Sequence, residues 1–357
     1  MASQSLLDPP AAPVLSIDRR RAGRRITDLP KLAVVIPALN EGATIASVVA
    51  AVPRMIVGVG VVEVIVVDDG SDDDTQACAR GAGVDVIVAH PHRRGLMAAF
   101  KLGMNEALRR GADIVVNLDG DGQHDPAYVP QMVAPILDRT ADIVLGVRPL
   151  SAAKDVMSPV RRFGNRAGSW LTGKALGLDI SDATSGYRAY AREALLRMNL
   201  VSDNTYTLET LVSASRQKLR VVEVAVPALR REVGESRMTG SIWGYIRRTA
   251  GQAFRSIIGH KLPCCLAVGG VIAMTAAAGC TLKFIVGYGT DGAGRHTPAL
   301  LAAVLTSVIA IGFFVSALMA DGISTTRRLL EDTLYHVKRL EYESAAAAEV
   351  HDDKLAV

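Results

Sequence analysis

Two long uncharged apolar segments late in the chain constrain its fold more than any other feature. The first covers residues 262–282 (LPCCLAVGGVIAMTAAAGCTL), and the second covers residues 297–320. A helix of about 20 apolar residues spans the hydrocarbon core of a bilayer, so each segment is long enough to cross a membrane. The competing interpretation is a helical hairpin buried in a soluble core. Because the two segments are adjacent in the sequence, we favour a two-helix transmembrane hairpin over residues 262–321.

Basic residues flank this hairpin on one side. They precede the first segment and follow the second: Arg247, Arg248, Arg255, Lys261, Arg327 and Arg328. The connecting loop, roughly residues 283–296, is short and weakly charged. An excess of Lys and Arg marks the cytoplasmic side of membrane proteins. We therefore expect a cell-membrane protein with two spans, both termini in the cytoplasm and the short loop outside.

The segments beside the hairpin have patterns of their own. Residues 241–261 place apolar side chains on one helical face with arginines beside them, as in a helix that lies in the membrane interface. An ordinary amphipathic helix of a soluble domain is the alternative. Residues 322–357 read as a cytosolic C-terminal helix and tail. Residues 1–30 contain the basic run DRRRAGRR, which favours a solvated disordered tail over a patch that binds anionic lipid.

Composition excludes some classes of protein. The formal net charge of +4 is too small to indicate a nucleic-acid partner. The four cysteines have neither metal-ligand nor disulfide spacing, which favours a reducing cytosolic environment. The first residues, MASQSLLDPPAAPVL, carry no early positive charge and no long apolar core. We therefore do not expect a secretory signal peptide there.

Residues 31–240 alternate short apolar runs with segments of helical spacing. The runs are KLAVVIPAL, VEVIVVDDG, VDVIVA, ADIVVNLDGDG and ADIVLGVR. This alternation predicts an α/β domain with a Rossmann-like, mostly parallel sheet. Ligands of such sheets bind at the carboxyl ends of the strands. Polar residues stand at three of these ends, within residues 37–41, 68–71 and 119–123.

The stretch NLDGDGQHDP gives the clearest chemical signal. Asp119 and Asp121 lie two residues apart, and Gln123 follows with an amide oxygen. Oxygen ligands suit Mg²⁺ or Mn²⁺, especially where substrate phosphates complete the coordination. His124 is close, but no pair of Cys or His residues competes for zinc. The pattern predicts a divalent-cation site made by these two acids and the glutamine, with a solvated acidic turn as the alternative.

The other two strand ends carry weaker signals. Asn40 and Glu41, in IPALNEG, could simply cap the following helix. Asp68 or Asp69, in VVDDGS, could orient a ribose or a base edge. A strand-to-helix turn, in which Asp, Gly and Ser are common, is the alternative for the second stretch.

Seven segments occur in a fixed order along the chain: VVIPALNEG, VEVIVVDDGSDDDT, NLDGDGQHDP, ADIVLGVR, FGNRAG, DATSGYRAY and RREVGESRM. Together they resemble glycosyltransferase family 2, and more narrowly its polyprenyl-phosphate hexosyltransferase branch. The resemblance covers about residues 31–240, and the two apolar segments match the membrane-anchored members. It implies a GT-A fold that transfers a hexose from a UDP- or GDP-sugar to a polyprenyl phosphate, for glycan or cell-envelope assembly. Family analogy also implies a homo-oligomer.

The resemblance implies roles for individual residues. Contact with the nucleotide is implied for Pro37, Ala38, Asn40, Glu41, Asp69 and Asp119. Metal binding is implied for Asp119, Asp121 and Gln123, with Asp121 and Gln123 as the direct ligands. Contact with the acceptor phosphate is implied for Arg148, Arg166, Ser236 and Arg237, and the catalytic set is Asp121, Arg148, Arg166 and Arg188. Arg237 stands where the family usually has Lys, which keeps the charge but changes its geometry.

The implied chemistry needs these residue types. A lipid phosphate is anionic near neutral pH and attacks the anomeric carbon without a strong general base. The protein must hold two phosphate groups together, which a metal and arginines achieve. Direct displacement inverts the anomeric centre. The alternatives are a processive polysaccharide synthase, which usually has more spans, another lipid acceptor, whose hydroxyl would want a general base, and a catalytically idle membrane scaffold.

Overall fold

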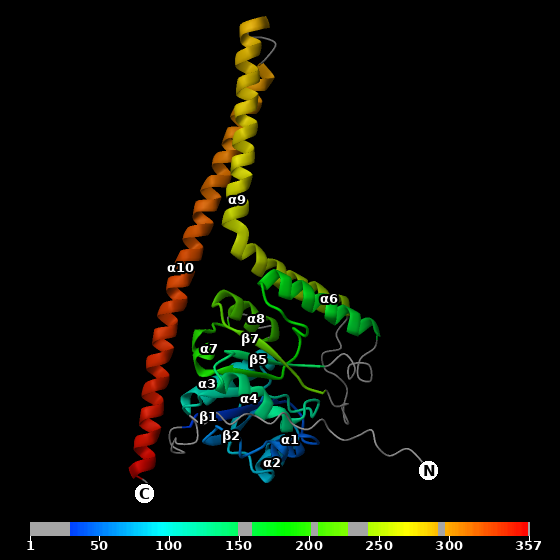
Figure 1. The fold of residues 1–357 in the computed structure, drawn as a ribbon, viewed down its shortest axis with the longest axis vertical. Helices are drawn as coiled ribbons and strands as arrows, with labels where there is room; N and C mark the ends of the chain where they lie inside the picture. The colour runs from blue at the N-terminus through cyan, green and yellow to red at the C-terminus, as the bar shows by residue number, and fades with distance from the viewer. Residues whose placement is uncertain (1–28, 149–158, 201–205, 228–241, 292–296, 356–357) are drawn as a thin grey trace.

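A computed structural model describes residues 29–148, 159–200, 206–227, 242–291 and 297–355. Figure 1 shows an α/β domain from which two long helices extend, α9 (Ile242–Asp291) and α10 (Thr297–Leu355). The tail over residues 1–28 and the two predicted residues Ser236 and Arg237 lie outside the described ranges.

A mixed sheet of seven strands forms the centre of the domain, in the order β3-β2-β1-β4-β6-β5-β7. Its strands are β1 (Lys31–Ala38), β2 (Val61–Asp68), β3 (Val86–Ala89), β4 (Ile114–Asn117), β5 (Ile143–Val147), β6 (Arg188–Ala191) and β7 (Val221–Ala225). Only the two pairings of β6, with β4 and with β5, are antiparallel. The predicted α/β fold with a mostly parallel sheet is therefore confirmed.

Helices cover both faces of this sheet. The helices of the domain are α1 (Ile45–Ala51), α2 (Thr75–Gly81), α3 (Leu96–Arg109), the 3₁₀ turn η2 (Pro126–Tyr128), α4 (Val129–Leu137), α6 (Pro159–Leu176), α7 (Arg192–Arg197) and α8 (Tyr206–Arg216), of which α6 packs on α8 and α9 and not on the sheet. Alternate side chains of β1 enter two separate cores: Val35 packs in the core that contains α3, and Val34 in the core that contains α1 and α4. Burial on both faces explains why these strands read as continuous apolar runs.

The strand register sets the place of the polar strand ends. Ala38 of β1 is paired with Asp68 of β2, which is itself paired with Ala89 of β3. Asn117 of β4 lies opposite Val35 of β1, so the residues that follow β4 pass beside the last residues of β1. The loops that follow the four parallel strands β1 to β4 therefore all begin at the same edge of the sheet.

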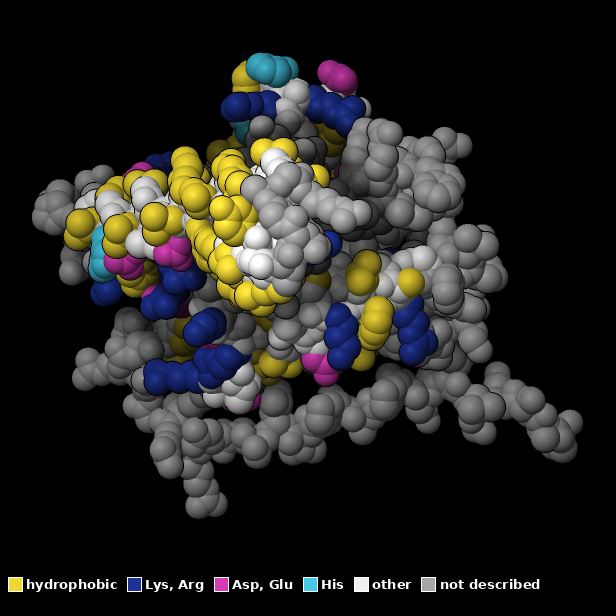
Figure 2. All heavy atoms as spheres, turned by 90° about the horizontal axis from the view of Figure 1, so that it is seen from above, with side chains coloured by type: hydrophobic (Ala, Val, Ile, Leu, Met, Phe, Trp, Pro, Cys, Tyr) yellow, Lys and Arg dark blue, Asp and Glu magenta, His cyan; other side chains and the backbone are white. Residues whose placement is uncertain are grey.

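The two long helices are candidate membrane spans. Residues Pro263–Gly289 and a window within Thr297–Tyr342 are long and apolar enough to cross a bilayer, and only 11% of each apolar window is buried. Figure 2, which looks at the molecule from above, shows hydrophobic side chains gathered along these helices. A hairpin inside a soluble core would bury these side chains, so the low burial favours the transmembrane interpretation.

Neither long helix breaks where the sequence suggested a boundary. The segment 241–261 and the first span form the single helix α9, with Pro263 inside it. Proline removes one helical hydrogen bond and favours a bend, and Figure 1 shows α9 bent, with its lower part lying over α6. The second span continues past residue 321 to Leu355 as one helix, because no proline or helix-ending glycine motif interrupts α10.

The lower half of α10 is attached to the domain. The Tyr335 hydroxyl donates to Glu193 Oε1 at 3.0 Å, and Lys338 Nζ donates to the carbonyl oxygen of Met198 at 2.9 Å. The Tyr342 hydroxyl donates to Asn105 Oδ1 at 3.0 Å, and its ring is 95% buried in the core that contains α3. The same helix therefore forms a candidate span and holds the domain.

Candidate active site

The loops that follow β1 and β2 are tied to each other. The Asn40 amide donates to Ser71 Oγ at 2.8 Å, and the Asp72 amide donates back to Asn40 Oδ1 at 2.9 Å. Asn40 has a φ of +48°, a left-handed conformation that asparagine tolerates better than most residues. It does not cap the next helix, whose N-cap residue is Thr44. Asn40 therefore shapes the edge of the sheet, and the backbone amide of its neighbour Glu41 donates a hydrogen bond to Thr75 Oγ1 at 2.9 Å.

The loop after β1 also contacts the acidic motif after β4. Thr44 Oγ1 donates to the carbonyl oxygen of Gly120 at 2.8 Å. A Cβ atom on Gly120 would lie 3.2 Å from the carbonyl oxygen of Pro37. The ends of β1 and β4 are therefore packed backbone to backbone, which places Pro37 and Ala38 directly beside the Asp119–Gln123 stretch.

The two acids that end β2 are both buried. Asp68 accepts hydrogen bonds from the Ser71 amide at 3.0 Å and from Gln76 Nε2 at 2.6 Å. Asp69 is 4% exposed and accepts bonds from the amides of Arg94 and Gly95 at 2.9 and 2.7 Å. The carboxylate predicted to contact a nucleoside is thus placed beneath the segment that leads into α3.

That segment, residues 90–95, is a part of the edge that the sequence analysis missed. His90 Nδ1 lies 2.9 Å from Asp69 Oδ1, and Arg93 and Arg94 are exposed. Gly95 has a φ of +97°, which few side chains tolerate. A basic pair followed by glycine at the start of a helix is the signal that could have identified it, since such positions suit phosphate groups.

Asp119 lies in a close-packed setting. A Cβ atom on Gly186 would come within 2.7 Å of Asp119 Oδ2 and 2.5 Å of the Tyr206 hydroxyl, so only glycine fits there. Asn117 Nδ2 holds this region together by donating to the Gly186 carbonyl at 2.9 Å and to the Tyr206 hydroxyl at 3.0 Å. Burial, followed by the negative charge of Asp121, raises the pKa of Asp119 to about 7. The two carboxylates are therefore close enough to repel each other.

The residues present fit a hard divalent cation. Repulsion between Asp119 and Asp121 is what a bound cation would relieve, and both offer oxygen ligands. The turn between them and Gln123 is preformed: Gly122 has a φ of +71°, and Asp121 Oδ1 accepts from the Gln123 amide at 3.1 Å. Within the described ranges, no three His, Cys, Asp or Glu side chains cluster as a metal site. The predicted set of two carboxylates and one amide thus leaves coordination positions for a ligand's oxygens.

His124 lies under this motif as a neutral side chain. It is 7% exposed, its ring centroid is 5.3 Å from that of Tyr187, and its Nδ1 has no hydrogen-bond partner. Burial, together with the positive charge of Arg148, lowers the pKa of His124 to about 4. His124 is therefore uncharged near neutral pH.

Arg148, predicted to contact phosphate, is fixed in place by an ion pair. Its Nε and Nη2 atoms donate to Asp182 Oδ2 at 2.9 and 2.7 Å. Asp182 Oδ1 accepts from Asn165 Nδ2 at 3.1 Å and from Thr184 Oγ1 at 2.8 Å. Burial alone would raise the pKa of Asp182, but the charge of Arg148 and these hydrogen bonds lower it below its ordinary value. The charge of Arg148 also lowers the pKa of Asp119, which indicates that Arg148 lies near this carboxylate.

The remaining predicted residues have different surroundings. Arg166 follows Asn165 on α6 and is exposed. Arg188 is 0% exposed, and its guanidinium donates to the carbonyl oxygens of Ser185 at 2.8 Å and Thr207 at 2.7 Å. Arg188 therefore holds β6 and α8 together as a buried residue, and its charge lowers the pKa of Asp119 more strongly than the charge of Arg148 does.

A family comparison covers most of this site. The profile described as Glycosyl transferase family 2 matches residues 33–198. The matched range runs from β1 to the residue after α7, so it contains all the predicted site residues except Ser236 and Arg237.

Individual proteins are similar over the same part. The chain is 34% identical over 223 residues to the undecaprenyl-phosphate mannosyltransferase of Micrococcus luteus. The aligned region covers 60% of this chain and 90% of that protein. It is 32% identical over 222 residues to the polyprenol monophosphomannose synthase of Mycolicibacterium smegmatis, covering 58% and 81%. Among solved structures, glucosyl-3-phosphoglycerate synthase from Mycobacterium tuberculosis is 24% identical with a TM-score of 0.48, covering 66% of this chain and 82% of that one.

Proposed function

Since this chain belongs to glycosyltransferase family 2 and is a glycosyltransferase, we propose that it transfers a hexose from a nucleotide-sugar to a polyprenyl phosphate. The observation that carries the proposal is the 34% identity to an enzyme named for that acceptor, over 90% of its length. The two candidate spans that follow the domain support a lipid acceptor independently.

The donor would bind at the edge of the sheet where β1, β2 and β4 end. Asn40 and Glu41 shape one wall, and the exposed Arg93 and Arg94 offer positive charge for the diphosphate. Asp119, Asp121 and Gln123 would hold Mg²⁺ or Mn²⁺. A divalent cation there would neutralise charge on the diphosphate and so make it a better leaving group.

The acceptor phosphate would lie beside the arginines on the other side of this edge. Arg148 is anchored by Asp182, and Arg166 is exposed on the adjoining helix α6. Arginine pairs well with phosphate oxygens and so offsets repulsion between the two substrates. A phosphate oxygen then forms a bond to the anomeric carbon while the bond to the diphosphate breaks, and the nucleoside diphosphate leaves. This direct displacement inverts the anomeric centre.

The membrane orientation is also part of the proposal. The basic residues around the spans favour a cytoplasmic domain and cytoplasmic termini. The lower part of α9, before Pro263, would lie in the interface, and residues 31–240 would form the catalytic domain. The domain would then meet the acceptor's phosphate at the cytosolic surface of the bilayer.

The first test is transfer of label into lipid. Membranes that contain the protein are incubated with undecaprenyl phosphate, Mg²⁺ or Mn²⁺ and a panel of radiolabelled UDP- and GDP-hexoses. We expect one donor to label the lipid fraction, and Asp121→Ala to abolish the labelling. Asp74→Ala is the control, because Asp74 is exposed and its side chain makes no capping hydrogen bond. Absence of lipid labelling from every donor would overturn the proposal.

A further inference from the structure

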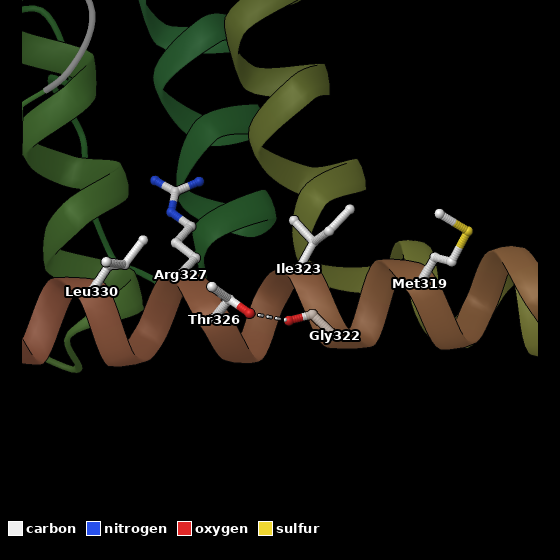
Figure 3. Close-up of a pocket in the computed structure, with 6 residues that line it drawn as sticks. All are labelled: Met319, Gly322, Ile323, Thr326, Arg327 and Leu330. Carbon is white, nitrogen blue, oxygen red and sulfur yellow. Dashed lines mark hydrogen bonds between the residues drawn. The ribbon is translucent and has the colours of Figure 1, made fainter.

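An unpartnered apolar stripe runs along α10 where this helix passes the domain. Its large side chains are 52% to 69% exposed: Met319, Ile323, Leu330, Val337 and Leu340. Figure 3 shows Met319, Ile323 and Leu330 projecting from the same side of the helix, where they line an open cavity of about 510 Å³. Residues 323–340 follow the predicted end of the span at residue 321, so this part of the row faces water, where apolar side chains exposed in a row are unfavourable and call for a partner.

The spacing of the stripe is that of a coiled-coil seam. Ile323, Leu330 and Val337 recur every seven residues, which makes them heptad a positions. Met319 and Leu340 fall on the d positions of the same heptads, and Thr326 and Thr333 fill the d positions between them. The seam is three heptads long, about 33 Å at 1.5 Å per residue.

The contacts that α10 already makes lie on a different side. The residues attached to the domain, Glu331, Tyr335, Lys338 and Tyr342, are heptad b and f positions. Position f lies opposite the a/d seam. The seam therefore faces away from the contacts that hold the domain.

From this geometry we propose that the seam binds the α10 helix of a second copy of this chain, as a parallel two-stranded coiled coil over residues 319–340. The orientation follows from the hairpin: two copies that cross one bilayer in the same sense present their α10 helices parallel. A β-branched residue at a with leucine at d favours two strands, and Val337 with Leu340 provides this combination. The inference needs only that the two helices span one bilayer and does not rest on the sugar or the acceptor.

The residues beside the seam fit such a pair. In a parallel coiled coil each g residue meets the e residue five positions later in the other helix. Leu329 would meet Leu334 of the second copy, which extends the apolar contact. His336 would meet Glu341, so no like charges face each other. A second copy thus fits both the apolar and the charged positions.

Cysteine cross-linking in native membranes tests the pairing. The four cysteines, Cys78, Cys264, Cys265 and Cys280, are first replaced by serine or alanine. Val337→Cys is then compared with Asp332→Cys, a c position whose side chain is 74% exposed. Under mild oxidation we expect Val337→Cys to form a disulfide-linked dimer several-fold faster than Asp332→Cys, because a positions of a parallel pair face each other.

A mixed cross-link tests register. Differently tagged Leu330→Cys and Val337→Cys chains are co-expressed. In-register pairing places positions 330 and 337 about 10 Å apart along the axis, so we expect each variant to cross-link to itself and not to the other. Equal cross-linking at positions 332 and 337, cross-linking at neither, or a link from position 337 to a different protein would each overturn the proposal. None of these outcomes depends on transferase activity.

Discussion

At the scale of single residues, the site depends on side chains whose neighbours are far away in sequence. Arg148 is fixed by Asp182, which is fixed in turn by Asn165 and Thr184. The sequence predicted Arg148 through its family motif, but no spacing rule links it to Asp182, 34 positions later. Asp119 and Asp121 were predictable because both lie in one short motif, whereas the packing of Gly186 against Asp119 depends on tertiary structure.

The geometry of Arg148 should matter beyond its charge. Arg148→Lys keeps the positive charge but loses the two-bond contact with Asp182, a charge-assisted interaction of about 1.5–3 kcal/mol. We expect transfer to fall about 10- to 100-fold, with nucleotide binding retained, measured as initial rates at varied acceptor concentration. Arg220→Lys is the matched control, because Arg220 makes the same kind of pair with Asp142 at an exposed place. An unchanged rate in Arg148→Lys would contradict the assignment.

The ion pairs that the buried Glu63 makes with the half-buried Arg110 and Lys31 predict a pH dependence of stability. Burial would raise the pKa of Glu63, but hydrogen bonds from Arg110 and Lys31 lower it below its ordinary value. Because the folded-state pKa is depressed, the stability that Glu63 contributes is present above its unfolded value of 4.5 and is lost as pH falls through the folded pKa.

Glu63→Gln should therefore lower the melting temperature at pH 7. The difference in melting temperature from the wild type should become smaller below about pH 4.5. Arg110 and Lys31 are each 27% exposed and can be hydrated once the carboxylate is lost, so the expected cost is about 1.5–3 kcal/mol, as for a hydrogen bond to a charged group. Thermal unfolding in detergent at several pH values measures this. Asp138→Asn, on the domain surface, serves as the control. A difference from the wild type that stayed constant down to pH 3 would argue against the ion pair as its cause.

At the scale of elements, apolar runs identified β1 to β5. Strands β1, β2, β4 and β5 are buried on both faces along most of their length, whereas β3 lies at the sheet edge and is only partly buried, although its four residues are also apolar. Strand β6 (Arg188–Ala191) escaped prediction, because four residues beginning with arginine have no recognisable strand pattern. Its first side chain is buried only because carbonyl oxygens from two other segments accept its hydrogen bonds. The sequence also led us to expect shorter helices than α9 and α10. The side chains change from polar to apolar along each helix, but the helical backbone continues across these changes.

Close packing of α3 on the sheet gives a prediction at this scale. A Cβ atom on Gly103 would lie 2.3 Å from Val35 Cγ1 and 2.8 Å from Val67 Cγ2, two side chains buried in the core. Gly103→Ala should therefore destabilise the domain by about 1–3 kcal/mol through overpacking. Gly81→Ala is the control, with open space around it and an expected change within about 0.5 kcal/mol. Equal melting temperatures for the two variants would show that α3 can move aside.

At the scale of the whole molecule, α10 connects the candidate span to the catalytic domain. The sequence indicated the span from its apolar length and the site from its motifs. It could not indicate that they are joined rigidly, because Tyr335, Lys338 and Tyr342 look like ordinary residues of a polar helix. Their contacts with Glu193, Met198 and Asn105 depend on the folded domain.

Weakening the contact between α10 and the domain should affect transfer to a membrane-embedded acceptor more than transfer to a water-soluble one. Tyr342→Ala removes a ring that is 95% buried and its bond to Asn105. We expect transfer to membrane-embedded polyprenyl phosphate to fall about tenfold or more, since positioning of the reacting groups is lost. Transfer to a water-soluble short-chain prenyl phosphate should change little. Asp332→Ala, on the exposed side of α10, is the control, and equal losses with both acceptors would show that the substitution damages the domain itself.

The unbroken course of α10 has a consequence for how such a chain can change. One residue inserted between the span and Glu331 would swing the domain by about 100° around the helix axis and raise it by about 1.5 Å. An insertion of seven residues would nearly restore the orientation of the domain around the helix axis but would move it about 10 Å further from the lipid surface. The orientation of the domain around the helix axis and its distance from the membrane are therefore coupled through the helical pitch. An insertion or deletion in this stretch cannot change one without changing the other.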